Sequence, residues 1–135
     1  MTVFSDMVTK METVLSTTIG LKLEDLSAID QNNWTANPLC QLVYDGYTPE
    51  DNFGERPKPK DANFTIQLRW RVKTQAEARD EINYWEDQIY SNMTVANIND
   101  TAKSVRFINH LGATSDLQNK LVFLDYPITV RYRDT

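Results

Sequence analysis

The sequence predicts an α+β fold: a four-stranded, mainly antiparallel sheet with two helices packed on one face, in the element order α-β-β-α-β-β. Two observations support this prediction. Between Asn63 and Lys73 apolar and polar residues alternate, as in a strand with one buried face. At Thr74 the period changes to that of a helix, so this strand runs into a helix with almost no linker.

The central strand and the helix after it define the expected core. The strand directs five apolar side chains to one face: Phe64, Ile66, Leu68, Trp70 and Val72. Thr74 and Glu77 fit a capping box at the start of the helix. An apolar stripe then follows at helical spacing: Ala78, Ile82, Trp85 and Ile89. We expect Trp70 and Trp85 to join the sheet to the helix.

The N-terminal third supplies the other helix and a strand. Residues from Val3 to about Thr18 are predicted to form an amphipathic helix, capped by Thr2 and ended by Gly20. Its apolar stripe indicates core packing, with a partner-binding groove as the alternative: Phe4, Met7, Val8, Met11 and Leu15. Residues 21–37 indicate only a short helical turn and loop. Residues 39–44 are apolar on both faces, which predicts an interior strand.

A long loop is predicted at about 45–62, because this stretch is rich in proline, glycine and charged residues. Its acidic residues Glu50 and Asp51 come first, and the basic residues Arg56, Lys58 and Lys60 follow. Loops of this length are usually functional or disordered. The segment is therefore either a solvated hairpin tip or an arm that contacts a neighbouring subunit or the lumen of a ring.

Two more strands are predicted in the C-terminal half, at 104–111 and 121–133, after a connection at 93–103 in which Val95 and Ile98 point inward. The first strand is expected to place Val105, Phe107 and Leu111 on one side. Residues 112–119 are polar and turn-like. Pro127 lacks an amide donor, which predicts a sheet edge or a bulge in the last strand.

Composition fits a single domain spanning residues 1–135. The net charge of −5 argues against a protein that binds nucleic acid by neutralising phosphates. The one cysteine, Cys40, lies in an apolar run and is expected to be a buried small hydrophobe. The N-terminus has no signal-peptide core and no run is long enough to cross a membrane, so we expect assembly in the cytoplasm and no membrane partner.

No pattern predicts catalysis, metal binding or a cofactor. The lone histidine, His110, has no Cys, His or carboxylate at a recognisable ligand spacing. Adjacent acids on a helix do not face each other, which argues against a carboxylate pair. Phosphate-binding glycine loops and nucleophile motifs are absent from the sequence. We therefore expect a protein that is not an enzyme, without catalytic, metal-binding or cofactor-binding residues.

Two oppositely charged surfaces suggest a contact between subunits. Arg69, Arg71 and Lys73 share the polar face of the central strand, and Arg131 and Arg133 have the same parity in the last strand. The helix is expected to present an acidic outer face: Glu77, Asp80, Glu81 and Asp87. Both surfaces are either simply solvated or meet head to tail between copies, which closes a ring if the rotation allows it.

Direct DNA binding is a weaker interpretation of the same basic residues. A nucleic-acid module would use Arg69, Arg71 and Lys73 with an aromatic side chain on which bases stack. Trp70, however, has the parity of the buried face, so it cannot stack on bases from the side of the arginines.

Taken together, these stretches resemble the tail terminator (tail-completion) proteins of long-tailed bacteriophages, including the minor tail protein U type. The similarity spans most of the chain and lies in general patterns. These are the N-terminal helix, the run from Asn37 to Tyr44, the acidic-to-basic loop, the alternating strand at 64–72, the helix with Trp85 to Tyr90, and the aromatic-flanked run from Tyr126 to Tyr132.

The resemblance implies a structural virion protein of the phage tail and neck. Such proteins form a hexameric ring at the head-proximal end of the tail tube, end its polymerisation and dock the head connector. The expected partners are further copies of the chain, the tail tube protein and the head–tail connector protein. DNA passes through the lumen without specific binding, and members of the family tend to keep that lumen acidic, a role for which Glu50 and Asp51 are candidates.

Two alternatives remain open at the level of the sequence. One is another head–tail connector, such as a stopper or head-completion protein. The other is a small monomeric module that binds a partner protein or nucleic acid.

Overall fold

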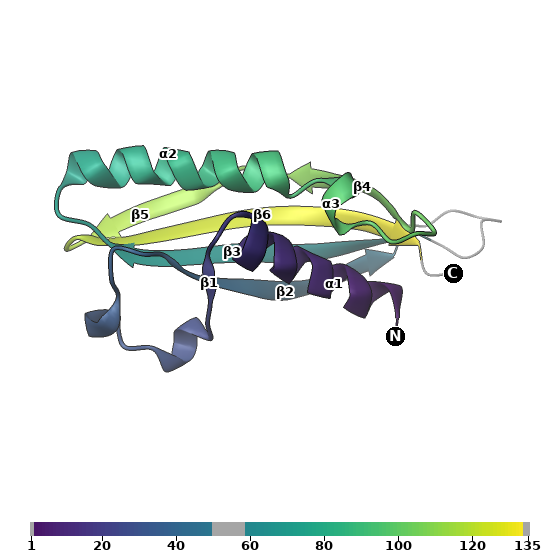
Figure 1. The fold of residues 1–135 in the computed structure, drawn as a ribbon, viewed down its shortest axis with the longest axis horizontal. Coiled ribbons are helices and arrows are strands. Elements are labelled where there is room, and N and C mark those ends of the chain that lie inside the picture. The colour runs from purple at the N-terminus through teal and green to yellow at the C-terminus, as the bar shows by residue number, and fades with distance from the viewer. Residues whose placement is uncertain (1, 50–58, 134–135) are drawn as a thin grey trace.

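The computed structural model describes residues 2–49 and 59–133. Its centre is a six-stranded mixed sheet in the order β1-β2-β3-β6-β4, with β5 also paired to β6 (Figure 1). The strands are β1 (Lys22–Leu23), β2 (Leu39–Pro49), β3 (Pro59–Arg71), β4 (Val105–His110), β5 (Thr114–Gln118) and β6 (Leu121–Arg133). The α-helices are α1 (Val3–Thr13), α2 (Gln75–Asn92) and α3 (Val95–Ile98). Shorter helical turns are η1 (Val14–Thr18), η2 (Leu26–Ala28) and η3 (Gln31–Asn33).

The prediction of a four-stranded, mainly antiparallel sheet with two helices is wrong, because the sheet has six strands, one of them parallel, and there are three α-helices. The strand β1 has only two residues and pairs in parallel with Leu39 and Cys40 of β2. The strand β5 contains a single apolar residue, Leu117, so it has no alternating pattern to reveal it. The four-residue helix α3 is likewise too short for a periodic signal.

The hairpin of β2 and β3 extends into the segment that was expected to be loop. Pairing continues from Leu39↔Arg69 as far as Pro49↔Lys60, with one bulge between Tyr44 and Gly46. On its other side β3 pairs with β6 over the full length of both strands. Backbone pairing on both sides therefore keeps residues 59–62 in the sheet despite their proline and charged residues.

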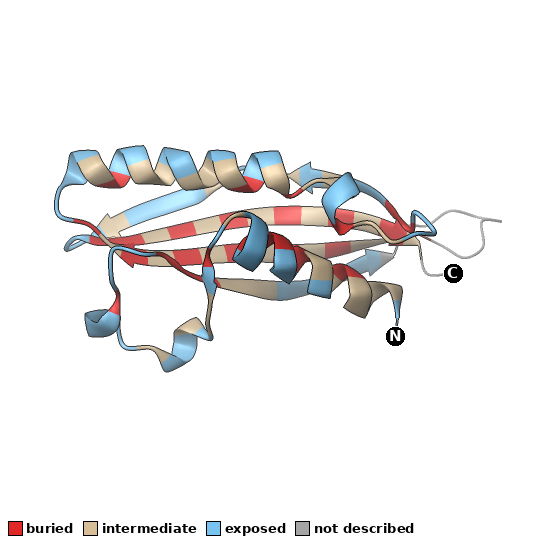
Figure 2. Cartoon of the chain, in the orientation of Figure 1, coloured by how far each residue is buried: buried red, intermediate tan, exposed pale blue. Residues whose placement is uncertain are grey.

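The helices α1 and α2 pack on the same face of the sheet (Figure 1), and the buried residues lie between them and the central strands (Figure 2). Alternate residues of β3 and β6 supply the floor of this core: Ala62, Phe64, Ile66, Leu68, Trp70, Val122, Leu124, Tyr126, Ile128, Val130 and Tyr132. Trp70 is fully buried, at 0% exposure, as its parity predicts. Trp85 is half-buried against the same core.

The predicted helix caps at Thr2 and Thr74 are confirmed, although at Thr74 the structure has only the hydroxyl half of the expected capping box with Glu77. The Thr2 hydroxyl accepts from the Ser5 amide at 3.0 Å, and the Thr74 hydroxyl accepts from the Glu77 amide at 3.1 Å. The N-terminal helix changes to the π-helical turn η1 at Val14 and stops before Gly20, whose φ of +88° few other residues adopt. Both caps satisfy amide donors that the first helical turn leaves without a partner.

A second, smaller core lies on the opposite face of the sheet, here called the open face, because none of α1, α2 and α3 covers it (Figure 1). Trp34 packs its ring against Phe123 of β6 with the centroids 5.2 Å apart. Leu39 and Leu121 are buried with it. The segment with η2 and η3, which the sequence left undefined, therefore covers one end of the open face.

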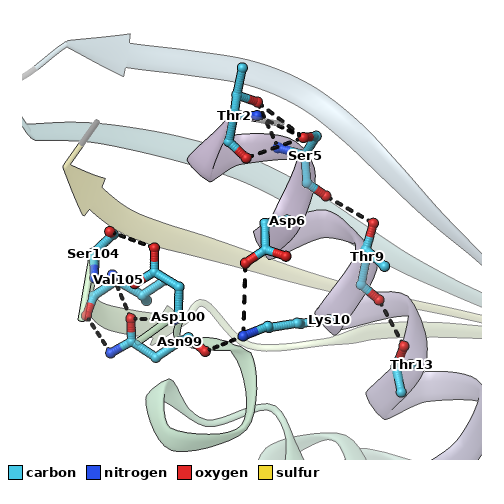
Figure 3. A network of polar contacts seen from close by, with 10 residues as sticks. All are labelled: Thr2, Ser5, Asp6, Thr9, Lys10, Thr13, Asn99, Asp100, Ser104 and Val105. Carbon is cyan, nitrogen blue, oxygen red and sulfur yellow. Dashed lines mark hydrogen bonds and ion pairs between the residues drawn. The ribbon is translucent and has the colours of Figure 1, made fainter. Parts of the chain in front are cut away.

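Polar contacts fasten α1 to the connection between α3 and β4 (Figure 3). Lys10 Nζ donates to the backbone carbonyl of Asn99 at 2.7 Å and lies 3.8 Å from the Asp6 carboxylate. The Asn99 side chain in turn bonds both backbone groups of Val105, at 2.9 and 3.1 Å. Ile98 is buried and Val95 packs on the core, so the prediction that both point inward is confirmed.

Pro127 lies neither at a sheet edge nor in a bulge, so that prediction is wrong. It pairs with Thr65 on the β3 side, while β5 covers β6 up to Asp125 and β4 covers it from Ile128 onward. The Pro127 carbonyl accepts from the Leu111 amide at 3.1 Å, so the backbone of Pro127 faces the junction of β4 and β5. The missing amide is tolerated because no ladder bond is required at this junction.

Candidate subunit interface

The arginines of the open face make contacts within the subunit. Arg69 Nη1 lies 2.9 Å from the Asp125 carboxylate and donates to the Leu124 carbonyl at 3.2 Å. Its guanidinium carbon is 5.2 Å from the centroid of the Phe123 ring. The Arg69 side chain is only 12% exposed. Its charge is therefore largely satisfied before any second copy approaches.

Arg71 and Lys73 are placed differently from each other. Arg71 donates to the backbone carbonyls of Trp34 and Gln31, both at 3.2 Å, and so binds the segment with η3 to the sheet. Lys73 lies beyond the end of β3 and is exposed. The open face thus does not present these three side chains as one row.

Arg131 also has an acidic partner on the open face. It makes two bonds to the Asp61 carboxylate, at 2.8 and 3.0 Å, and its guanidinium lies 4.7 Å from the Phe107 ring centroid. With the Arg69–Asp125 pair, this leaves the open face much closer to neutral than the count of arginines suggests.

The acids of α2 divide between inner and outer positions. The Glu81 carboxylate accepts from Trp70 Nε1 at 2.9 Å, so it turns toward the sheet. Asp80 and Asp87 are exposed, and Glu77 is half-buried. At 100° per residue Asp80 and Asp87 lie within one narrow stripe of the helix surface, which leaves an acidic outer face smaller than the sequence indicated.

Only Lys60 among the loop candidates belongs to the described residues. Glu50, Asp51, Arg56 and Lys58 lie outside the described residues. Lys60 belongs to β3, and its ammonium group lies 5.4 Å from the centroid of the Tyr47 ring.

The sequence did not identify the exposed apolar side chains along the edges of the sheet. The prediction that Val105, Phe107 and Leu111 lie on one side of their strand is wrong, because Arg106 is an extra residue in a bulge of β4. The bulge turns Phe107 to the open face, where it is exposed, while Val105 is buried. Tyr44 and Tyr47 are exposed on β2 at the other edge. Bulges leave no reliable signal in a hydrophobic pattern, so the sequence alone does not locate these side chains.

The ionisable groups of the core have structural contacts. Burial raises the pKa of the Cys40 thiol to about 12, as expected for a buried small hydrophobe. His110 Nδ1 lies 2.6 Å from the Tyr126 hydroxyl, and burial lowers the pKa of His110.

Within residues 2–49 and 59–133, no group of three or more His, Cys, Asp or Glu side chains is arranged to hold a metal ion. None of the helices in the same ranges is long and apolar enough to span a membrane.

These features define an α+β domain whose described surface includes an open sheet face, an outer side of α2 with two exposed acids, and two sheet edges with exposed apolar side chains. No protein-family model matches the chain, and no curated protein matches it in sequence. Among solved structures, it is similar to a chain from the "Virion of native gene transfer agent (GTA) particle". The TM-score is 0.54 at 12% sequence identity, over 98% of this chain and 92% of that chain. At this identity the similarity demonstrates a shared fold.

Proposed function

We propose that this chain is a structural protein of a phage-type virion. The observation that supports this most is the fold, which is shared over nearly the whole of both chains with a component of a virion particle. The patterns that resemble tail terminator proteins point in the same direction independently of that comparison.

Within that class, we propose a tail terminator. Six copies form a ring at the head-proximal end of the tail tube, end its polymerisation and provide the surface that the head connector binds. DNA passes through the lumen of this ring without specific contacts. The exposed apolar side chains of the two sheet edges agree with a role in assembly: Tyr44, Tyr47, Phe107 and Leu111.

Contacts between the copies are proposed to include charged side chains that remain available on the surface. Lys73 is the exposed basic candidate, and Asp80 and Asp87, with half-buried Glu77, are the acidic ones. Rim charges of this kind influence orientation and association rate more than affinity. We assign a role in the fold of the subunit to Arg69, Arg71 and Glu81, because their polar atoms already have partners inside it.

Native mass spectrometry of the purified chain, alone and with the tail tube protein of the same particle, tests this function. We expect a hexamer that forms either alone or on contact with the tube protein, and electron microscopy should show it at one end of tubes of limited length. Unlimited tube growth in the presence of the chain would contradict termination. A monomer that binds the head connector and leaves tubes uncapped would indicate a head-completion protein instead.

A further inference from the structure

The two edges of the sheet hold most of the large apolar side chains that are exposed among the described residues. Tyr44 and Tyr47 lie on β2, one edge strand. Phe107 lies on β4, the other edge strand, and Leu111 follows it directly. Tyr90, at the end of α2, packs against His110 of β4 with ring centroids 4.9 Å apart. Among the large apolar side chains of the described residues, only Tyr84, on the outer side of α2, is exposed away from both edges.

Both edges also have backbone groups without a strand partner. The short β1 pairs with β2 only at Leu39 and Cys40, so in the described residues no strand covers β2 from Gln41 to Pro49. Likewise no described strand lies beyond β4. An uncovered edge strand is a template for pairing with another chain, and clustered exposed apolar side chains mark interaction surfaces.

Each edge strand is interrupted by a bulge, and the extra residue is charged in both. In β2 the extra residue is Asp45, between Tyr44 and Gly46. In β4 it is Arg106. Both side chains are exposed. Asp45 accepts a hydrogen bond from the Thr65 hydroxyl of the same subunit at 2.6 Å, and Arg106 makes no ion pair with any residue in the described part of the chain.

The two edges therefore carry opposite charges, and their exposed apolar side chains lie on opposite faces of the sheet. Tyr44 and Tyr47 are on the face that the helices cover, whereas Phe107 is on the open face, so in a sheet continued from copy to copy they cover the two sides of the same contact.

The strand directions favour a head-to-tail contact. Each step from β2 to β3, from β3 to β6 and from β6 to β4 is antiparallel, so β2 and β4 run in opposite directions. Copies related by rotation about an axis parallel to the strands bring β2 of one copy beside β4 of the next in antiparallel orientation. Because the two edges are different surfaces, such a contact closes a ring when the rotation allows it.

We propose that the β2 edge of one copy, formed by Tyr44, Asp45 and Tyr47, binds the β4 edge of the next copy, formed by Arg106, Phe107 and Leu111. The occupant of each edge is a second copy of this chain. The inference rests on the proposed function, since it assigns the surfaces through which the ring subunits meet.

The first test places a charge on one apolar edge. Tyr47→Lys and Leu111→Lys should each raise the concentration needed for hexamer formation by about tenfold or more, as loss of a central interface side chain does. Asn32→Lys is the control, because Asn32 is exposed in η3, away from both sheet edges and from the acidic side of α2. The control should assemble like the original chain. Urea unfolding of all three variants should give the midpoint of the original chain, so that a loss of assembly reports the interface.

The second test uses the head-to-tail arrangement. A one-to-one mixture of Tyr47→Lys and Leu111→Lys chains retains one intact pair of edges, so it should give heterodimers and no rings. Asp45→Arg and Arg106→Asp should each weaken assembly, and the double variant should recover it.

Assembly of every variant is followed by native mass spectrometry with and without tail tube protein. If the original chain forms hexamers and both edge variants form them equally well, the edge contact is wrong while the ring function stands. If the original chain forms no hexamer in either condition, the proposed function fails and the edge contact fails with it.

Discussion

The indole Nε1 of Trp70 donates a 2.9 Å hydrogen bond to the carboxylate of Glu81, which joins the central strand to α2 from inside the core. Trp70 is fully buried, so its N–H has no access to bulk water. A buried donor that loses its partner costs the free energy of its desolvation. Glu81 therefore belongs to the fold of the subunit, although its position in the sequence places it among the acids of an outer helix face.

Replacing Glu81 by Ala should lower the free energy of unfolding by roughly 1–3 kcal/mol, because the Trp70 indole N–H would lose its acceptor. The neighbouring Asp80→Ala is the control and should change it by less than about 0.5 kcal/mol, since Asp80 is exposed. Urea denaturation measures both values. A loss in Glu81→Ala as small as the loss in Asp80→Ala would show that the hydrogen bond contributes nothing to the free energy of unfolding.

Replacing Trp70 by Ala should cost about 3–5 kcal/mol, as removal of a large buried aromatic side chain usually does. Trp85→Ala should cost less, because Trp85 is half-buried at the margin of the same core. Thermal and urea unfolding of the two variants give the comparison. A larger loss of unfolding free energy in Trp85→Ala than in Trp70→Ala would contradict the assignment of Trp70 to the centre of the core.

Arg69→Ala should reduce stability by roughly 1–3 kcal/mol, because it removes the partner of Asp125 and leaves the Leu124 carbonyl without its guanidinium donor. Lys73→Ala, the control, removes an exposed charge and should leave the unfolding free energy nearly unchanged. If Arg69 acted only between subunits, the monomer would keep its full stability and assembly alone would suffer.

The free energy of unfolding should fall at both alkaline and acid pH because of two side chains that are in contact, Tyr126 and His110. Burial, with smaller contributions from Tyr90 and Glu86, raises the pKa of Tyr126 to about 12. The contribution of the Tyr126 hydroxyl to the free energy of unfolding is fully present below its pKa in the unfolded chain, about 10. It is lost as the pH rises from there through the pKa in the folded protein.

At the acid end the responsible group is His110. Burial lowers its pKa in the folded state, partly offset by a hydrogen bond with the Met93 backbone. The unfolded chain therefore takes up its proton first, and stability is lost as the pH falls below about 6.5 through the folded value. Urea midpoints measured across the pH scale test both arms. In Tyr126→Phe the urea midpoint should fall less at alkaline pH than in the original chain. In His110→Phe it should fall less at acid pH.

Lys120→Gly should stabilise the protein by up to about 1 kcal/mol. Asn119 and Lys120 form the two-residue turn between β5 and β6, with φ angles of 52° and 66°. Lysine is strained at such an angle, whereas Asn-Gly is the preferred pair in this kind of hairpin turn. The melting temperature measures the effect. Lys120→Ala is the control and should give no gain, because alanine has the same backbone restriction.

The sequence by itself determined the elements in which many side chains repeat one pattern. The alternation in β3 and β6 determined which of their side chains are buried, and the stripe of α2 determined which side of that helix faces the core, because each face of a regular element repeats at a constant interval. The caps at Thr2 and Thr74 were equally local. Elements held by backbone pairing or by too few residues, such as β1, β5 and α3, left no pattern of that kind.

Only the tertiary structure decided what the charged and edge residues do. Arg69, Arg131 and Glu81 look like free surface charges in the sequence. Each has a partner on another strand or helix of the fold, at Asp125, Asp61 and Trp70 respectively. The bulge at Arg106 exposes Phe107 by inserting one residue into the ladder. Ion pairs and bulges depend on which strands become neighbours, and that depends on the whole chain rather than on any local period.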